Sequence, residues 1–213
     1  MPLDLSKPGP KIHAGIILMG ETEILDVAPI DFLHALSPKF IHVLPIPDEL
    51  KAKALDMEFH WTAGISLNAK DSYETCPTLD IVLIGAYFPT YTPTETDLNF
   101  IRKTHDDCAA FLTICGGFLP AQLAGLLAGH TATAPRFMLP MLREQDLRTT
   151  WVKKRAHRDG KIWTSGTLLN GLDMMREFGM HYWPELTAVA VPLWGWPERV
   201  VEYDGPLEQL VGR

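Results

Sequence analysis

The chain has 213 residues, 46% of them hydrophobic and 9% aromatic, which is enough to bury the core of one large α/β domain. Its formal net charge is −7 and its densest basic cluster is residues 153–155, which argues against a nucleic-acid partner because phosphate binding needs clustered Lys and Arg. No window approaches the roughly 18 apolar residues of a membrane span, and residues 1–11 lack the apolar stretch of a signal peptide. We therefore expect a cytoplasmic protein without a membrane partner, folded as one domain over residues 1–213.

The predicted elements alternate between strands and helices along the chain. Apolar runs of strand length predict strands at residues 13–19, 40–44, 79–84, 109–114, 131–133 and 161–164. Helical periodicity and capping residues predict helices at residues 24–36, 94–105, 121–128, 136–148 and 168–181. Residues 48–70 have a mixed pattern with a short helix and a small hairpin, and the tail after residue 182 reads as irregular. This alternation predicts a mostly parallel sheet, covered by helices on both faces, with its core at about residues 12–182.

Cysteine and histidine spacing bears on cofactors. The three cysteines, Cys76, Cys108 and Cys115, are an odd number without metal-ligand spacing, so neither a disulfide framework nor a zinc site is indicated. The eight histidines show no ligand spacing, and the glycines do not form a dinucleotide-binding pattern. We expect reduced thiols, no metal and no cofactor.

Cys115 stands at the most informative position of the chain. An apolar run of strand type stops at Cys115, turns on Gly116 and Gly117 and enters a helix-like stretch. A side chain at such a turn is pushed out of the sheet, while backbone N–H groups and the positive end of the helix dipole face it. These groups would stabilise a thiolate and an oxyanion, which predicts a nucleophile with a lowered pKa. The alternative is a buried structural thiol, since free cysteine is often buried.

Two other strands end near candidate ligand-binding residues. Glu21 follows the first strand and Gly85 follows the strand at residues 79–84. The carboxyl ends of parallel strands share one edge of a sheet, where ligands of such folds bind. Glu21, Gly85 and Cys115 are therefore expected at the same edge.

Several short segments, in their order along the chain, resemble the ThiJ/PfpI superfamily. They are Leu-Asp-Val-Ala-Pro at 25–29, the run 79–85, Ile-Cys-Gly-Gly at 114–117 with Ala-Gly-Leu-Leu-Ala-Gly at 124–129, and Arg-Asp-Gly-Lys at 158–161 leading to Gly-Leu-Asp at 171–173. The resemblance covers roughly residues 12–180. Within the superfamily the chain most resembles the isocyanide hydratase-like branch.

The resemblance implies a flavodoxin-like three-layer αβα sandwich, a homodimer, and a reactive cysteine with an acidic residue from the first βα loop beside its sulfur. Cys115 matches the nucleophile, and Asp26 is the best match for the acid. The interval from Asp26 to Pro29 is one residue shorter than the family pattern, so Glu23 and Glu21 stay alternatives for the carboxylate.

Three departures from the family pattern bear on mechanism. Peptidase-like members carry histidine directly after the nucleophile, whereas this chain has Gly116, which speaks against proteolysis. The hydratase-like branch has Thr-Thr-His-Trp after the elbow helix, where this chain has Thr-Ala-Pro-Arg at 133–136. The usual Gly-Gly pair after the third strand is Gly85-Ala86-Tyr87 here, which keeps the N–H donors but adds a phenol.

These features predict a cofactor-independent cysteine enzyme of the hydratase or lyase type. The Cys115 sulfur would add to a small electrophile such as an isocyanide, and Asp26 would donate a proton and then activate water. The N–H groups of Gly116 and of Ala86 or Tyr87 would hold the negative charge. Two alternatives stay open: a glyoxalase-like or chaperone-like stress protein, and a non-catalytic redox sensor in which Cys115 is oxidised to a sulfinic acid.

Overall fold

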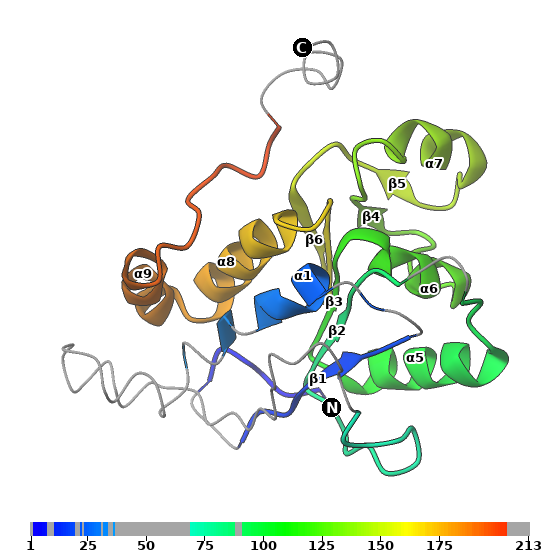
Figure 1. The fold of residues 1–213 in the computed structure, drawn as a ribbon, viewed down its shortest axis with the longest axis horizontal. Coiled ribbons are helices and arrows are strands. Elements are labelled where there is room, and N and C mark those ends of the chain that lie inside the picture. The colour runs from blue at the N-terminus through cyan, green and yellow to red at the C-terminus, as the bar shows by residue number, and fades with distance from the viewer. Residues whose placement is uncertain are drawn as a thin grey trace.

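A computed structural model describes residues 2–7, 11–19, 22, 24–30, 32–33, 36, 69–87 and 91–203. Figure 1 shows its elements, which are in chain order β1 (Ala14–Ile17), α1 (Ile24–Val27), the 3₁₀ helix η1 (Ala28–Ile30), β2 (Ile81–Ile84), α5 (Glu95–Asp107), β3 (Ala110–Thr113), the 3₁₀ helix η2 (Cys115–Gly117), α6 (Phe118–Leu123), β4 (Thr131–Ala132), α7 (Leu139–Gln145), β5 (Thr150–Trp151), β6 (Ala156–Asp159), β7 (Ile162–Ser165), α8 (Asn170–Tyr182) and α9 (Pro184–Leu193).

The central sheet has the strand order β1-β2-β3-β7-β6. The first four strands are parallel, and β6 pairs antiparallel with β7 at the edge. The hairpin between β6 and β7 turns at Gly160, whose φ of 62° lies in the left-handed region that glycine adopts at no steric cost. The predicted mostly parallel sheet is confirmed, while β6 was not predicted. A separate two-stranded parallel sheet joins β4 and β5.

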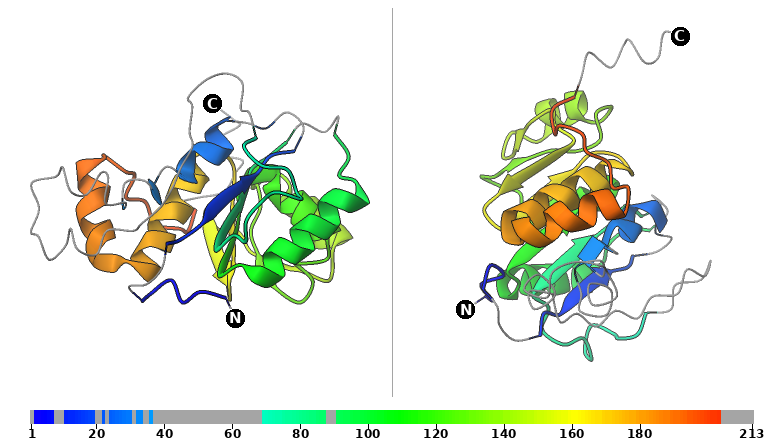
Figure 2. Two further views of the ribbon diagram at one scale, coloured as in Figure 1. Left: turned by 90° about the horizontal axis from the view of Figure 1, so that it is seen from below. Right: turned by 90° about the vertical axis from the view of Figure 1, so that its left-hand side faces the viewer.

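Helices cover both faces of this sheet (Figure 2). Alternate residues of β2 point to opposite faces, so that Ile81 and Leu83 join one buried cluster and Val82 and Ile84 join the other. The first cluster includes residues of η1, α8 and α9, and the second includes residues of α5, α6 and α7. Strands buried on both faces explain the continuous apolar runs of the sequence. The architecture is a three-layer αβα sandwich.

Proline explains where several helices differ from their predicted bounds. The predicted helix 24–36 changes to a 3₁₀ helix after Val27, because Pro29 has no N–H to continue the α-helical pattern. The predicted helix 136–148 is shorter and has Pro140 in its first turn, where the missing N–H costs nothing. The tail predicted as irregular contains α9, which begins at Pro184 and has Pro192 near its end.

The remaining differences are local. The prediction of a helix at 94–105 is confirmed by α5, whose start is fixed by a capping box between Thr94 and Asp97. The helix after the elbow begins at Phe118 and ends at Leu123, earlier than predicted. The strand predicted at 40–44 and the mixed segment 48–70, apart from its last two residues, lie outside the described residues.

Candidate active site

Cys115 stands on a strained turn at the carboxyl end of β3. Its φ of 54° lies in the left-handed region, which a side chain with a Cβ rarely adopts. The N–H of Ile114 donates to the Ile84 carbonyl at 3.0 Å, and the N–H of Cys115 donates to the Gly166 carbonyl at 3.0 Å. These two bonds tie the turn to the neighbouring strands and hold its strained backbone. Cys115 therefore stands on a tight turn between β3 and α6.

Gly117 lets the elbow sit close to the sheet. A Cβ added to Gly117 would lie 2.1 Å from the carbonyl oxygen of Ile84. No side chain fits there without moving backbone. The second glycine of the elbow is therefore required by packing against β2.

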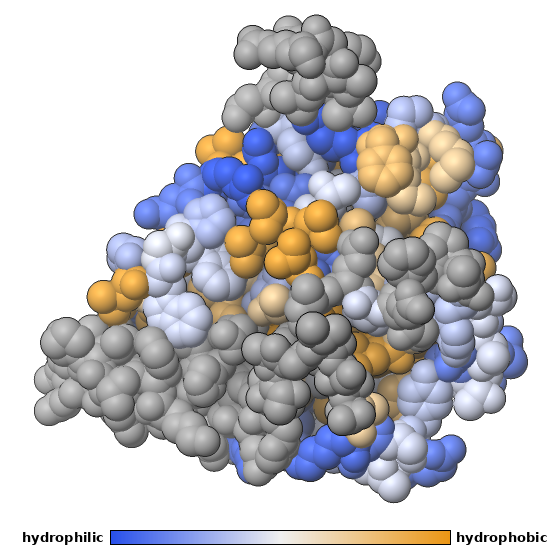
Figure 3. All heavy atoms as spheres, in the orientation of Figure 1, coloured by the Kyte–Doolittle hydropathy of each residue, from blue (hydrophilic) through white to orange (hydrophobic). Residues whose placement is uncertain are grey.

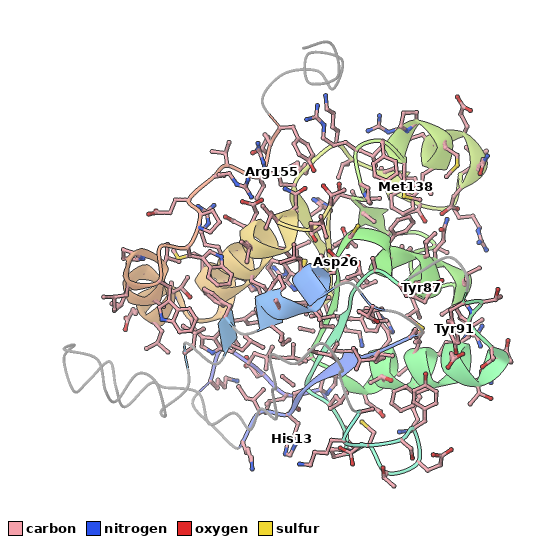
Figure 4. All side chains as sticks on the ribbon, in the orientation of Figure 1. His13, Asp26, Tyr87, Tyr91, Met138 and Arg155 are labelled. Atoms are coloured by element: carbon pink, nitrogen blue, oxygen red, sulfur yellow. The ribbon has the colours of Figure 1, made fainter. Side chains whose placement is uncertain are left out.

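Asp26 lies fully buried on α1, near the ends of β2 and β3 (Figure 4). Its Oδ2 accepts a hydrogen bond from the N–H of Ala86 at 3.0 Å. Gly85 makes this approach possible, because a Cβ on Gly85 would lie 3.1 Å from the Asp26 Cβ and 2.8 Å from the Val27 Cγ1. The loop after β2 thus positions the carboxyl group.

The structure brings Cys115 and Asp26 together, as the resemblance implies. The Asp26 carboxyl group lies close enough to the Cys115 sulfur for its negative charge to raise the pKa of the thiol. Both alternatives for the carboxylate, Glu21 and Glu23, lie outside the described residues. Asp26 is therefore the carboxyl group that the described part of the chain places against the thiol.

The pKa of Cys115 is raised to about 11, so the expectation of a lowered pKa is wrong. Burial is the largest cause, and the negative charge of Asp26 adds to it. The N–H groups of Leu168 and Gly116 donate to the sulfur and oppose the shift. The predicted helix dipole is weak because α6 has only six residues. At neutral pH the Cys115 thiol therefore keeps its proton beside the Asp26 carboxyl group.

The donor from Leu168 was missed by the sequence analysis. Leu168 has a φ of 37° and lies between β7 and α8. The segment Ser165-Gly166-Thr167 marks a loop at the carboxyl end of a strand, which is the one local signal that could have indicated it. Its N–H comes from a loop more than 50 residues after the nucleophile, and only the parallel pairing of β3 with β7 brings the two together.

The other predicted oxyanion donors divide into two kinds. The Gly116 N–H faces the Cys115 sulfur, whereas the Ala86 N–H is bonded to Asp26, so Ala86 acts on the carboxyl group instead of on an oxyanion. Tyr87 is half-buried and forms an antiparallel bridge with Thr22, which links the loops after β1 and β2. Its phenol ring packs edge-on against Tyr91, at 6.1 Å between centroids.

Two exposed leucines are sequence neighbours of Asp26 and Leu168. Leu25 precedes Asp26 and is 50% exposed, and Leu169 follows Leu168 and is 51% exposed. Figure 3 shows hydrophobic side chains gathered on the face where α1 and the start of α8 lie in Figure 1. This rim fits an apolar substituent better than a charged one.

Within the described ranges, no group of three or more His, Cys, Asp or Glu residues is placed to hold a metal ion. Over the same residues, no helix has both the length and the apolar character that crossing a membrane requires.

One characterised protein is similar in sequence to most of this chain. An isonitrile hydratase from Pseudomonas putida is 29% identical over 168 residues, which cover 76% of this chain and 68% of that protein. The chain is therefore similar in sequence to an isonitrile hydratase. No family model matches the sequence.

Solved structures of ThiJ/PfpI and DJ-1 proteins share the fold of this chain. A ThiJ/PfpI family protein from Pseudomonas syringae superposes with a TM-score of 0.68 at 15% identity, over 94% of this chain and 81% of that one. DJ-1beta from Drosophila melanogaster has a TM-score of 0.65 at 13% identity, over 89% of this chain and 100% of that one. A putative transcriptional regulator from Vibrio parahaemolyticus has a TM-score of 0.66 at 15% identity, over 87% of this chain and 99% of that one. The predicted flavodoxin-like fold is confirmed, and the chain is similar to proteins of the ThiJ/PfpI superfamily that the sequence resembles.

Proposed function

We propose that this protein hydrates a small isonitrile to the corresponding N-formamide without a cofactor. The observation that carries the proposal is the Cys115–Asp26 pair, in which the sulfur of a strained, partly buried cysteine lies beside a fully buried carboxyl group. The similarity to an isonitrile hydratase supports the hydratase class. The absence of a histidine at position 116 argues against a peptidase.

The first half of the reaction uses the proton of the Cys115 thiol, with Asp26 beside it. The sulfur of Cys115 forms a bond to the terminal isonitrile carbon, and the proton of the Cys115–Asp26 pair moves to that carbon. The product is a thioimidate bound to the sulfur, beside an ionised Asp26. Asp26 is deeply buried and close to the sulfur, which suits it to transfer a proton over a short distance.

The second half consumes one water molecule. Asp26 removes a proton from the water as its oxygen attacks the thioimidate carbon, and this proton passes to the substrate nitrogen. The C–S bond then breaks as the carbon–oxygen double bond forms, and the remaining hydroxyl proton returns to the pair. The N–H groups of Leu168 and Gly116 stabilise the departing thiolate. One water is added in total and the enzyme is regenerated.

The proposed substrate carries an apolar substituent. Leu25 and Leu169 are exposed and adjoin Asp26 and Leu168 in the sequence, so we propose that an aryl or alkyl group on the isonitrile nitrogen contacts them. The homodimer implied by the resemblance and the cytoplasmic location stay part of the proposal. Light scattering tests the dimer, for which the expected mass is twice that of the 23.8 kDa chain.

A substrate panel on the wild-type protein tests the proposal. We expect an aryl isonitrile to yield its N-formamide, detected by proton NMR, and methylglyoxal to stay unchanged. Methylglyoxal consumption without formamide would instead support a glyoxalase-like protein. If neither substrate reacts and peroxide adds two oxygen atoms to Cys115, the redox-sensor interpretation replaces the proposed function.

A further inference from the structure

The segment Arg199–Tyr203 packs against the loop that supplies the Leu168 donor. We propose that Arg199 and Tyr203 are positioning residues that hold the Leu168 N–H against the Cys115 sulfur. This inference deepens the proposed function and rests on Cys115 being its nucleophile. Neither side chain needs to touch the substrate.

The loop between β7 and α8 needs such support. Its Gly166 carbonyl accepts the Cys115 N–H at 3.0 Å, and the Leu168 N–H faces the sulfur and lowers the pKa of the thiol, from a backbone with φ of 37°. A leucine in this conformation persists only where the surrounding contacts hold it. Relaxation of Leu168 toward negative φ would turn its N–H away from the sulfur.

Tyr203 contacts this loop from outside. Its hydroxyl donates to Asn170 Oδ1 at 2.7 Å, at the start of α8. A Cβ added to Gly166 would lie 2.4 Å from the Tyr203 hydroxyl oxygen and 2.5 Å from the Asn170 oxygen. The Tyr203 hydroxyl and the Asn170 amide oxygen therefore occupy the space beside the Gly166 backbone. The hydrogen bond between Tyr203 and Asn170 links this contact at Gly166 to the start of α8.

Arg199 holds the same loop at a second point. Its Nη2 donates to the Leu169 carbonyl at 3.2 Å, and its Nε and Nη2 donate to the two oxygens of Asp173 at 2.9 and 2.8 Å. Asp173 is fully buried and also accepts from Asn170 Nδ2 at 3.1 Å. A two-point arginine–carboxylate contact of this kind fixes orientation as well as distance.

The segment itself is anchored to the body of the protein. The Tyr203 ring lies between two guanidinium groups, with Arg136 at 4.4 Å and Arg155 at 4.9 Å from its centroid. The N–H of Arg155 donates to the Val201 carbonyl at 2.6 Å, and its Nη1 donates to the Val200 carbonyl at 3.0 Å. Arg136 precedes α7 and Arg155 precedes β6, so both arginines belong to the body of the protein. Their contacts with residues 200–203 can therefore resist movement of the loop.

The charged groups that act on Cys115 differ from those that act on Tyr203. An effect of loop geometry on the sulfur can therefore be distinguished from an effect of charge. Asp26 is the charged group that acts on Cys115, while Arg136, Arg155, Asp173 and Arg199 act on Tyr203. Burial raises the pKa of Tyr203 to about 12, so its phenol keeps its proton at neutral pH. Substitution of Tyr203 by phenylalanine then changes no charge, and any change in the sulfur's reactivity reports the loop geometry.

The test measures iodoacetamide alkylation of Cys115 against pH, with the site identified by peptide mass spectrometry and Tm measured in parallel. We expect Tyr203→Phe to move the midpoint of the profile to higher pH and to slow alkylation at pH 8 by about three- to tenfold, the size of one lost hydrogen bond to the sulfur. Arg199→Lys, which keeps the charge but loses the two-point contact, should shift the midpoint in the same direction.

Tyr73→Phe is the matched control, because the Tyr73 hydroxyl donates to Asp97 at 2.6 Å, in a network at the start of α5. It should change Tm and leave the alkylation profile unchanged. Wild-type profiles in both Tyr203→Phe and Arg199→Lys, or a shift to lower pH, would overturn the inference. Alkylation of Cys115 does not depend on isonitrile turnover. If the variants shift the alkylation profile but the wild-type protein forms no formamide, the positioning role is retained and the proposed function is rejected.

Discussion

The surroundings of Cys115 oppose the ionisation that its proposed role requires. Burial and the neighbouring carboxylate raise the pKa of the thiol, yet attack on a carbon requires the thiolate. The position of Cys115 was predictable from the strand and the Gly-Gly turn, which are local features of the sequence. The direction of its pKa was not, because burial and the orientation of Asp26 depend on β2 and α1 meeting beside β3.

Asp26→Asn separates the two roles of this carboxyl group. Removal of the negative charge lowers the pKa of Cys115, so alkylation by iodoacetamide should become faster at pH 8. Hydration of an isonitrile should nevertheless fall by about 10²- to 10⁴-fold, because the proton donor is lost. Initial rates of both reactions measure this, with Asp80→Asn at the opposite end of β2 as the control. Parallel loss of both rates in Asp26→Asn would contradict the assigned roles.

At the scale of elements, the ends of β2 and β3 determine the site. Gly85 and Gly117 remove the side chains that would separate α1, the elbow and the sheet. The strands and α5 were predictable because apolar runs and a capping box are local signals. The bounds of α6 and the presence of α9 were not, since packing decides whether a proline-containing segment becomes helical.

Gly117→Ala should lower the free energy of unfolding by about 1–3 kcal/mol or more, because its Cβ would overlap the Ile84 carbonyl. Gly116→Ala is the matched control, since a Cβ there would lie 3.2 Å from the Ala86 Cβ and needs only a small adjustment. Urea unfolding followed by circular dichroism compares the two variants. Equal loss of stability would show that the contact with β2 does not distinguish the two glycines.

At the scale of the whole molecule, the topology brings together segments that are distant in sequence. Alternating strands and helices predicted the parallel sheet, but they carried no information about residues 199–203 contacting residues 166–170. The edge strand β6 was also missed, because its sequence Ala-His-Arg-Asp is mostly polar and lacks a strand-like apolar run. Long-range contacts of irregular segments have no local pattern from which they can be predicted.

Two cysteines with raised pKa values make folding sensitive to alkaline pH. Burial raises the pKa of Cys108 to about 11 and that of Cys115 to about 11, above the value of about 8.5 in an unfolded chain. The stabilisation is complete below the unfolded pKa and is lost as pH rises toward 11. The fall in Tm between pH 8 and pH 10.5 should therefore be smaller in Cys108→Ala than in the wild type. An identical fall would show that the Cys108 thiol does not contribute.

The central claim is that Cys115 performs the hydration of an isonitrile, and product formation in a cysteine variant tests it most directly. Proton NMR follows N-formamide formation from an aryl isonitrile in wild type, Cys115→Ala and the control Cys108→Ala, at a temperature where all three are folded. We predict formamide from the wild type and from Cys108→Ala, and none above the uncatalysed rate from Cys115→Ala. Formamide formation by Cys115→Ala at the wild-type rate would contradict the account.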